Sequence, residues 1–483
     1  MAFRLSQLRL TVYLVAFALP ISAMTPAQAR ESIAWAPYAY PLRSGETVPA
    51  QLGTIDVPLR RGIHSASTTT LKFVKLPSTR AGGGVPIIYL AGGPGSSGIE
   101  AGEGDRALLF DRLRQHGDVI LLDQRGTGLS SPPPACSKPW QFPAAAAATE
   151  ASVNSTLESA LRACAAEWRG AGVDLSAYNT ADNADDVADL IRALGVAKAR
   201  LVGISYGTFL GFAVLREHGE LIESAVFAGT EGPDHTIKLP TQADAALALL
   251  STEIAATPEG RAVAPDLQGS VKRVFAQLAK EPVTVELKDG GKQVVSLYDA
   301  QMVTAFLMAT SANAVMLPGL FKAMEAGDFS GMAGMVRRLR GFYGALPAMP
   351  FATDAASGSS PARERQTRRL AGTSIFGNAV NFPSANLSGA LGVELLPQRY
   401  WAPLRSRVPA LFISGSLDSR TPPANAEEVR KGFRNSAHLI IAGAGHDNDL
   451  FLSTPVIMDR IDAFFSGKGQ ADETVTVHIL RFK

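Results

Sequence analysis

Short apolar segments alternate with helical patterns along most of the chain. Between two of these segments, residues 180–194 carry apolar side chains at helical spacing, with Asp182 and Asp185 near the favourable N-terminus. This order predicts right-handed crossovers and an α/β fold with a mostly parallel, doubly wound sheet. The apolar segments, bounded by Gly, Pro or Asp as buried parallel strands are, lie at 85–90, 119–122, 200–204, 224–228, 410–414 and 438–442.

Two further patterns complete the predicted architecture. Residues 53–57 and 70–76 alternate in polarity, which predicts an antiparallel hairpin at one edge of the sheet. Residues 232–401 are too long for a simple connection between strands, and their Ala- and Leu-rich segments predict an inserted helical cap. Within this cap, we expect 352–369, rich in Ser, Ala and Arg, to be a mobile loop. The core that carries the sheet would then comprise 30–231 and 402–483.

The N-terminus has the pattern of a targeting segment. Arg4 and Arg9 precede an apolar stretch at 10–19, and the small-residue pattern Ala27-Gln28-Ala29 follows it. This predicts a secretory signal peptide at 1–29, removed before Arg30, and a periplasmic or extracellular protein. The alternative, a membrane anchor, is disfavoured because a spanning helix needs roughly 20 apolar residues.

Composition narrows the possible partners. With 483 residues, 46% of them hydrophobic and 19% charged, the chain can bury a large core and is not a disordered tail or a fibre. Its net charge is 46 − 44 = +2, with no basic block. We therefore expect no nucleic-acid partner and no stable membrane anchor.

The two cysteines, Cys136 and Cys164, form an even pair in a chain predicted to be exported. This favours a disulfide, with two free buried thiols as the alternative. Two cysteines are too few for a zinc site, and no cluster of His or Cys supplements them. We expect neither a metal nor an organic cofactor.

Ser205 lies in a Gly-x-Ser-x-Gly pattern at 203–207, directly after one predicted strand and before a predicted helix. The pattern alone is weak evidence, but this position predicts a tight turn that presents a nucleophilic hydroxyl. A serine needs a base and an orienting carboxylate. Asp418 and His446 each follow a later predicted strand, and the order Ser, Asp, His is that of α/β hydrolases.

Amide donors for an oxyanion are available at two places. The Gly-rich turn at 92–95 follows a strand, so Gly93 is one candidate donor, and the backbone N–H of Tyr206 is the other. Taken singly, such a turn is more often only a turn, and an Asp after a strand is more often a loop residue. Together they predict a Ser205–His446–Asp418 triad.

Three motifs of the chain resemble those of a known protein family. The segments Gly92-Gly93-Pro94-Gly95, Asp123-Gln124-Arg125-Gly126 and Gly203-Ile204-Ser205-Tyr206-Gly207 are similar to those of the prolyl and tripeptidyl aminopeptidases. The resemblance covers about 50–231 and 402–466 but not the cap, and it implies an α/β-hydrolase fold. One departure is Ala91, which stands where the family's first motif commonly has His. In this resemblance Asp123 and Arg125 look like scaffold residues that hold the oxyanion turn.

An aminopeptidase must bind a free ammonium group, and a carboxylate is the physical means. Glu231, just after the fifth strand, is our candidate, although it could equally be a solvated loop residue. The leading hypothesis is an exported serine aminopeptidase that releases residues or short peptides through an acyl-enzyme. The alternatives are an esterase or small-amide hydrolase with the same triad, and an inactive binding protein on this scaffold.

Overall fold

A computed structural model describes residues 33–41, 47–62, 67–383, 386–468 and 471–480. The signal peptide predicted at 1–29 lies outside these residues. Of the helices within these ranges, not one has the length and apolar character required to cross a membrane.

Ten strands of the described chain form one sheet, in the order β1-β2-β3-β5-β4-β6-β7-β10-β11-β12. Strands β1, β2 and β3 pair antiparallel at one edge, and β3 pairs antiparallel with β5. The remaining pairs are parallel, which confirms the predicted α/β sheet and its edge hairpin. The bounds are β1 Ala34–Pro41, β2 Thr47–Pro58, β3 Thr68–Leu76, β4 Ile87–Leu90, β5 Val119–Asp123, β6 Ala199–Ser205, β7 Ile222–Thr230, β10 Ala410–Gly415, β11 Ser436–Ala442 and β12 Glu473–Thr476.

Helices cover both faces of the sheet. Along β4, Ile88 and Leu90 pack in one hydrophobic cluster, whereas Ile87 and Tyr89 pack in another, because successive side chains of a strand point to opposite faces. The first cluster includes residues of α3, α4 and α15, and the second includes residues of α1, α16 and α17. These helices are α1 Ala107–Leu113, α3 Thr180–Ala193, α4 Tyr206–His218, α15 Pro423–Arg430, α16 Asp449–Leu452 and α17 Pro455–Phe465.

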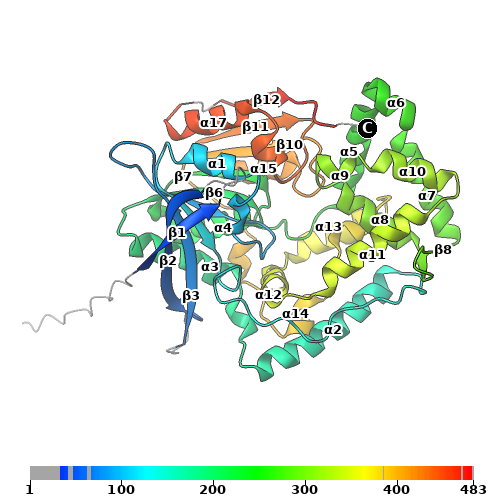
Figure 1. Cartoon of the computed structure of the whole chain (residues 1–483), viewed down its shortest axis with the longest axis horizontal. Helices are drawn as coiled ribbons and strands as arrows, with labels where there is room; N and C mark the ends of the chain where they lie inside the picture. Colours follow the sequence, from blue (N-terminus) through cyan, green and yellow to red (C-terminus); the bar gives the residue numbers. More distant parts are fainter. Residues whose placement is uncertain (1–32, 42–46, 63–66, 384–385, 469–470, 481–483) are drawn as a thin grey trace, which may run out of the picture.

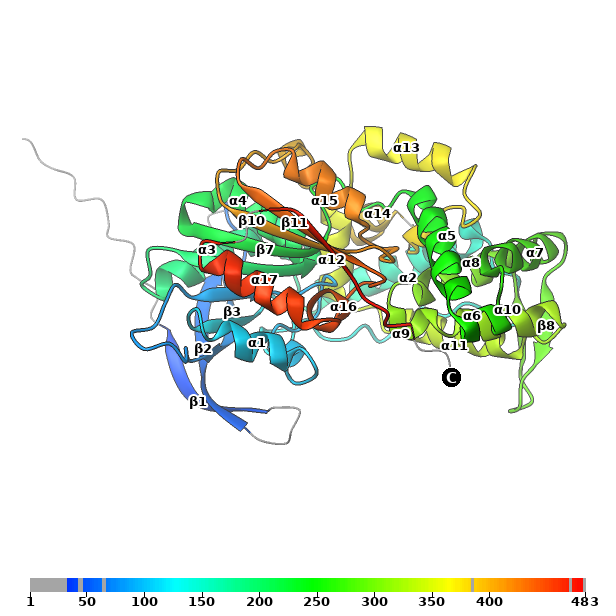
Figure 2. The ribbon, with the colours of Figure 1, turned by 90° about the horizontal axis from the view of Figure 1, so that it is seen from above.

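A separate helical layer lies to one side of the sheet, and most of its helices come from the segment predicted to be the cap (Figures 1 and 2). Its hydrophobic cluster also contains buried residues between 136 and 178, so a segment before β6 joins the cap layer. Its helices are α2 Glu150–Gly170, α5 Pro240–Ala256, α6 Pro258–Val263, α7 Leu267–Lys280, α8 Leu297–Leu307, α9 Ser311–Ala314, α10 Leu317–Glu325, α11 Ser330–Gly344, α12 Ala348–Ser357, α13 Pro361–Ala371 and α14 Leu387–Leu391. A hairpin of β8 Val283–Glu286 and β9 Lys292–Val295 accompanies them. Short 3₁₀ helices occur in both the core and the cap, at Glu100–Gly102, Leu175–Ala177, Gly219–Leu221, Ala379–Asn381 and Gln398–Tyr400.

The prediction of a mobile loop at 352–369 is wrong, because most of this segment belongs to α12 and α13. Gly358, with φ +52°, separates the two helices. Ser360 then accepts a hydrogen bond from the Arg363 N–H as the N-cap of α13, and Pro361 occupies the first helical position. Ala and Arg are strong helix formers, so the Ser residues that suggested a loop are restricted to the helix boundary.

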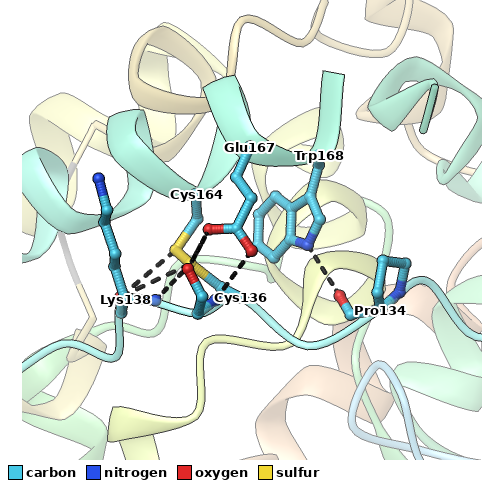
Figure 3. Close-up of a disulfide and its surroundings, with 7 residues drawn as sticks. Pro134, Cys136, Lys138, Cys164, Glu167 and Trp168 are labelled. Carbon is cyan, nitrogen blue, oxygen red and sulfur yellow. Dashed lines mark hydrogen bonds between the residues drawn. A yellow bond between two sulfur atoms is a disulfide. The ribbon is translucent and has the colours of Figure 1, made fainter. Parts of the chain in front are cut away.

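The predicted disulfide between Cys136 and Cys164 is confirmed, with the two Cα atoms 5.4 Å apart (Figure 3). It joins the segment before α2 to the middle of that helix. One turn further along α2, the Trp168 indole N–H donates to the Pro134 carbonyl at 2.9 Å. The bond and this contact hold the extended segment against α2.

Candidate active site

Ser205 ends β6 and is the N-cap of α4. Its φ of +55° is rare for a residue with a side chain, and such strain is typical of a nucleophile turn. A Cβ on Gly207 would lie 2.0 Å from the Leu90 carbonyl oxygen, and one on Gly203 would lie 2.7 Å from the Gly207 oxygen. Gly207 is therefore required by the close approach of α4 to β4, and Gly203 by that of α4 to its own strand, β6.

Asp418 and His446 are hydrogen-bonded to each other. Asp418 Oδ2 lies 2.7 Å from His446 Nδ1. The Thr421 hydroxyl lies 2.6 Å from the same carboxylate oxygen and 3.0 Å from His446 Nδ1. The other oxygen, Asp418 Oδ1, accepts the backbone N–H groups of Arg420 and Thr421, both at 2.8 Å. The imidazole is thus oriented with Nδ1 toward the acid and Nε2 away from it.

Asp418 is fully buried, and burial by itself would raise the pKa of its carboxyl group. The neighbouring imidazole, the Thr421 hydroxyl and the backbone N–H of Thr421 all stabilise the charged form and outweigh that effect. The pKa of Asp418 is therefore below its ordinary value. A carboxylate is thus available beside His446 at neutral pH.

Ser205 and His446 line the same cavity, which has a volume of about 360 Å³. Gly92 and Gly93 border it from the core side. Within the described chain the Ser205 hydroxyl makes no hydrogen bond, and contacts of this kind are often long before substrate binds. The cap supplies an apolar wall to the cavity, made of Met302, Ala305, Phe306, Ala309, Leu339, Tyr343, Ala379, Val380 and Phe382.

A bulge in the sheet makes room for the imidazole. Ile204 pairs with Ala228, but Ser205 pairs with Thr230, so Gly229 is the extra residue. Its φ is +60°, and a Cβ there would lie 2.8 Å from His446 Cε1. The bulge therefore lets the histidine ring lie against the strand next to Ser205, and only glycine fits there.

The two candidate oxyanion donors belong to the turn after β4 and to the first residue of α4. Gly93 lines the cavity with φ +111°. Tyr206 begins α4, and its buried hydroxyl lies 3.0 Å from that of Thr180, away from its own backbone N–H. The turn that carries Gly93 is held by Asp123, whose carboxylate accepts from the Ser97 hydroxyl at 2.6 Å and from the Leu129 N–H at 2.8 Å. The oxyanion role itself stays a prediction.

Glu231 is buried, and its carboxylate pairs with Lys238 Nζ at 2.8 Å. It is not among the residues that line the Ser205 cavity, although its backbone N–H donates to Thr208, whose hydroxyl lies 2.7 Å from the Ser205 carbonyl. Glu231 is therefore close to the turn at Ser205 but already has a cation beside it. Its predicted role in binding an ammonium group remains untested.

Asp354 is a second acid near this place, and the sequence analysis did not single it out. It is one turn after Pro350 on α12, and Pro350 packs so tightly on Gly95 that a Cβ there would be 2.3 Å from Pro350 Cγ. Asp354 is half-buried, and its neighbours on either side in α12 are buried. Burial and the nearby Glu231 raise the pKa of Asp354 to about 7, although Lys238 and Arg420 oppose this.

This raised pKa predicts that Asp354 weakens the fold at alkaline pH. Between about pH 4 and 7 the folded state keeps a proton that the unfolded state has lost, so this group's contribution to stability falls as pH rises through that window. We expect Asp354→Asn to abolish this part of the pH dependence. At pH 8 it should raise the free energy of unfolding by about 2–4 kcal/mol. Denaturation followed from pH 5 to 8 checks this, and an equal effect at both ends of the range would contradict it.

Two other contributors escaped the sequence analysis. Thr421 bridges Asp418 and His446, and its place three residues after the acid was a usable signal. Arg106, which also lines the cavity, donates to the Tyr89 hydroxyl at 2.6 Å and to Asn448 Oδ1 at 2.8 Å, and pairs with Asp447. These partners come from β4 and from the segment after His446, so nothing local in the sequence indicates the contact.

Comparisons with known proteins agree with this fold. The family described as alpha/beta hydrolase fold matches residues 85–283, and the family described as TAP-like protein matches residues 396–477. Tripeptidyl aminopeptidase of Streptomyces coelicolor is 24% identical over 458 residues, which cover 89% of this chain and 83% of that protein. Serine protease Hip1 of Mycobacterium tuberculosis is 26% identical over 191 residues, covering 38% of this chain and 36% of that protein.

Among solved structures, a thermophilic esterase from Thermogutta terrifontis aligns with 83% of this chain and 95% of its own. The identity is 16% and the TM-score 0.36, which says nothing about a substrate.

Proposed function

We propose that this chain, which belongs to the prolyl and tripeptidyl aminopeptidase family of α/β hydrolases, is an exported aminopeptidase that uses Ser205, His446 and Asp418 as its triad. The observation that carries the proposal is the pairing of Asp418 with His446 at 2.7 Å, with His446 and Ser205 lining one cavity. One family model, over residues 85–283, includes Ser205, and the other, over residues 396–477, includes Asp418 and His446.

The proposed chemistry needs only groups of the protein. His446 Nε2 removes the proton from Ser205 as its oxygen attacks the scissile carbonyl, and Asp418 stabilises the imidazolium that forms. The N–H groups of Gly93 and Tyr206 donate to the oxyanion of the tetrahedral intermediate. His446 then gives the proton to the departing amine, which leaves an acyl-enzyme. Water, activated by His446, releases the acid and restores the Ser205 hydroxyl.

The preference for a free amino terminus would come from the acidic pair Glu231 and Asp354. Because Lys238 already balances Glu231, a second carboxylate is needed to face a substrate ammonium. Asp354, which interacts with Glu231 and lies near Lys238 and Arg420, supplies it once ionised. A substrate ammonium would then be the cation that completes the group. Export rests on the signal peptide predicted at 1–29.

The test is a panel of fluorogenic aminoacyl, dipeptidyl and tripeptidyl substrates, each with a free and an N-acetylated amino terminus. We expect acetylation to lower kcat/KM by about 10–150-fold, the value of a hydrogen bond to a charged group. Equal turnover of both forms would reject the aminopeptidase and leave the esterase or small-amide hydrolase. The length of the free-amine substrate with the highest kcat/KM reports how many residues the enzyme releases.

Glu231→Gln belongs in the same panel. This substitution should lower kcat/KM for substrates with a free amino group. It should have little effect on kcat/KM for the acetylated substrates. Glu253→Gln is the matched control, since Glu253 is another cap carboxylate, on α5, and is absent from the cavity lining. A loss that is the same for both substrate forms would mean that Glu231 only supports the fold.

A further inference from the structure

The loop that carries His446 is bonded to the cap as well as to the core. We call residues 443–449 the histidine loop. The His446 backbone N–H donates to the Ala309 carbonyl at 2.8 Å. Ala309 lies between α8 and α9, and it also borders the cavity that contains Ser205. The backbone of this histidine is therefore held by the cap, while its ring is held by Asp418 and Thr421 of the core.

Asp449 strengthens this connection. Its Oδ2 atom accepts the Gly445 N–H at 2.9 Å and the Ser311 N–H at 3.2 Å. Gly445 precedes His446, and Ser311 is the first residue of α9 in the cap. A Cβ on Gly445 would lie 2.9 Å from the Ser311 nitrogen, so the two segments meet with no space for a side chain. One carboxylate oxygen thus ties the histidine loop to the cap backbone.

We propose that Asp449 is a positioning residue for His446, through which the position of the cap sets the position of the imidazole. This inference rests on the proposed function, because it assumes that His446 is the base. Among the described residues, Asp449 is not in the lining of the cavity, and its side-chain hydrogen bonds go to the backbone of Gly445 and Ser311. Its effect passes through the backbone on both sides of the histidine.

The consequence for catalysis follows from how strictly proton transfer depends on distance. A displacement of about 1 Å in a catalytic group can cost on the order of 10²-fold in rate. Asp418 restrains only one edge of the ring, so the Cα position of His446 decides where Nε2 points. On the core side, Arg106 restrains the residues after His446 through Asp447 and Asn448. Without Asp449, the cap side of the loop would keep only the Ala309 bond.

The first experiment replaces Asp449 by Ala and by Asn. We expect Asp449→Ala to lower kcat by on the order of 10²-fold with KM changed by less than about threefold, because the cavity is intact. Asp449→Asn should recover most of the loss, since its amide oxygen can still accept both N–H groups. Asp459→Ala, an exposed acid on α17, is the control and should leave kcat unchanged.

The second experiment removes the same contact from the cap side. Ser311→Pro deletes the N–H that Asp449 accepts and places a ring carbon where the two segments meet, so it separates α9 from the histidine loop. Proline is tolerated at the first position of a helix. The preceding Thr310 has φ −124° and ψ 150°, a conformation that suits a residue before proline. Ser311→Ala keeps the N–H and is the matched control. We expect Ser311→Pro, but not Ser311→Ala, to lower kcat, and the loss should not add to that of Asp449→Ala.

Labelling by a fluorophosphonate separates this inference from the proposed function. If the unaltered chain is not labelled at Ser205, the proposed function fails. If it is labelled, and folded Asp449→Ala reacts at the same rate and keeps kcat within about twofold, the positioning role of Asp449 is overturned. Should Asp449→Ala not fold, the Ser311→Pro and Ser311→Ala pair decides: equal kcat in the two variants overturns the inference, and a selective loss in Ser311→Pro supports it.

Discussion

Replacing Ser205 or His446 by alanine is expected to lower kcat by on the order of 10⁶, and the double variant should lose no more than either alone. The reason is that nucleophilic attack needs both the Ser205 hydroxyl and the His446 base that takes its proton. When one of them is removed, the other no longer contributes to the rate. Asp418→Asn should cost about 10⁴, because an amide beside His446 Nδ1 favours the wrong tautomer. The measurement is steady-state hydrolysis of the best substrate of the panel.

The control for this prediction is Ser96→Ala. Ser96 lines the same cavity and is absent from the proposed triad, so its hydroxyl should matter little for kcat. Losses that add in the Ser205 and His446 double variant would show that the two residues do not act as one unit. Full activity in Ser205→Ala would place the nucleophile elsewhere and remove the basis of the proposed mechanism.

The largest expected effect on stability is that of Arg125→Met. The Arg125 side chain is fully buried and forms two hydrogen bonds with Asp186, at 2.7 and 2.6 Å. It also donates to the backbone carbonyls of Pro58, Leu59 and Ala177, which joins the edge of the sheet to the segment before α3. Removing it leaves a buried carboxylate without this partner, which should cost about 3–5 kcal/mol.

Urea unfolding at neutral pH checks the prediction, with Arg192→Met as the control. Arg192 also pairs with an acid of α3, Asp189 at 3.0 Å, but it is exposed, and such a pair contributes at most about 1 kcal/mol. An Arg125→Met protein as stable as the control would mean that other groups of the cluster compensate for its loss. The folded fraction of Arg125→Met should keep its kcat, since Arg125 acts on the scaffold.

The sheet and the placement of the proposed triad were predictable because their signals are local. A buried parallel strand is a short apolar segment wherever it lies in the chain, and the carboxyl ends of parallel strands meet at one edge of the sheet. Ser205, Asp418 and His446 each follow such a segment, so their convergence required no knowledge of side-chain packing. The disulfide was predictable for a similar reason, since the chain offers only two cysteines.

The cap was predictable only as an insertion with helices. The error at 352–369 shows why: composition indicated a loop, but α12 packs on the turn at Gly95 and is stabilised by burial that no local pattern records. The position of α2 within the cap layer also follows from packing that no local pattern in the sequence records. Helices of an insertion have no register fixed by a shared sheet, so their positions follow from side-chain packing alone.

By itself, the sequence determined the α/β sheet, its edge hairpin and the order in which three chemical groups reach one rim of that sheet. Only the tertiary structure decided that Glu231 meets Lys238, that Asp354 approaches this pair and that Asp449 joins the histidine loop to α9. The physical reason is the range of the interactions. Strand periodicity and tight turns are properties of a few neighbouring residues, whereas ion pairs and backbone contacts between the cap and the core form only once distant segments have packed together.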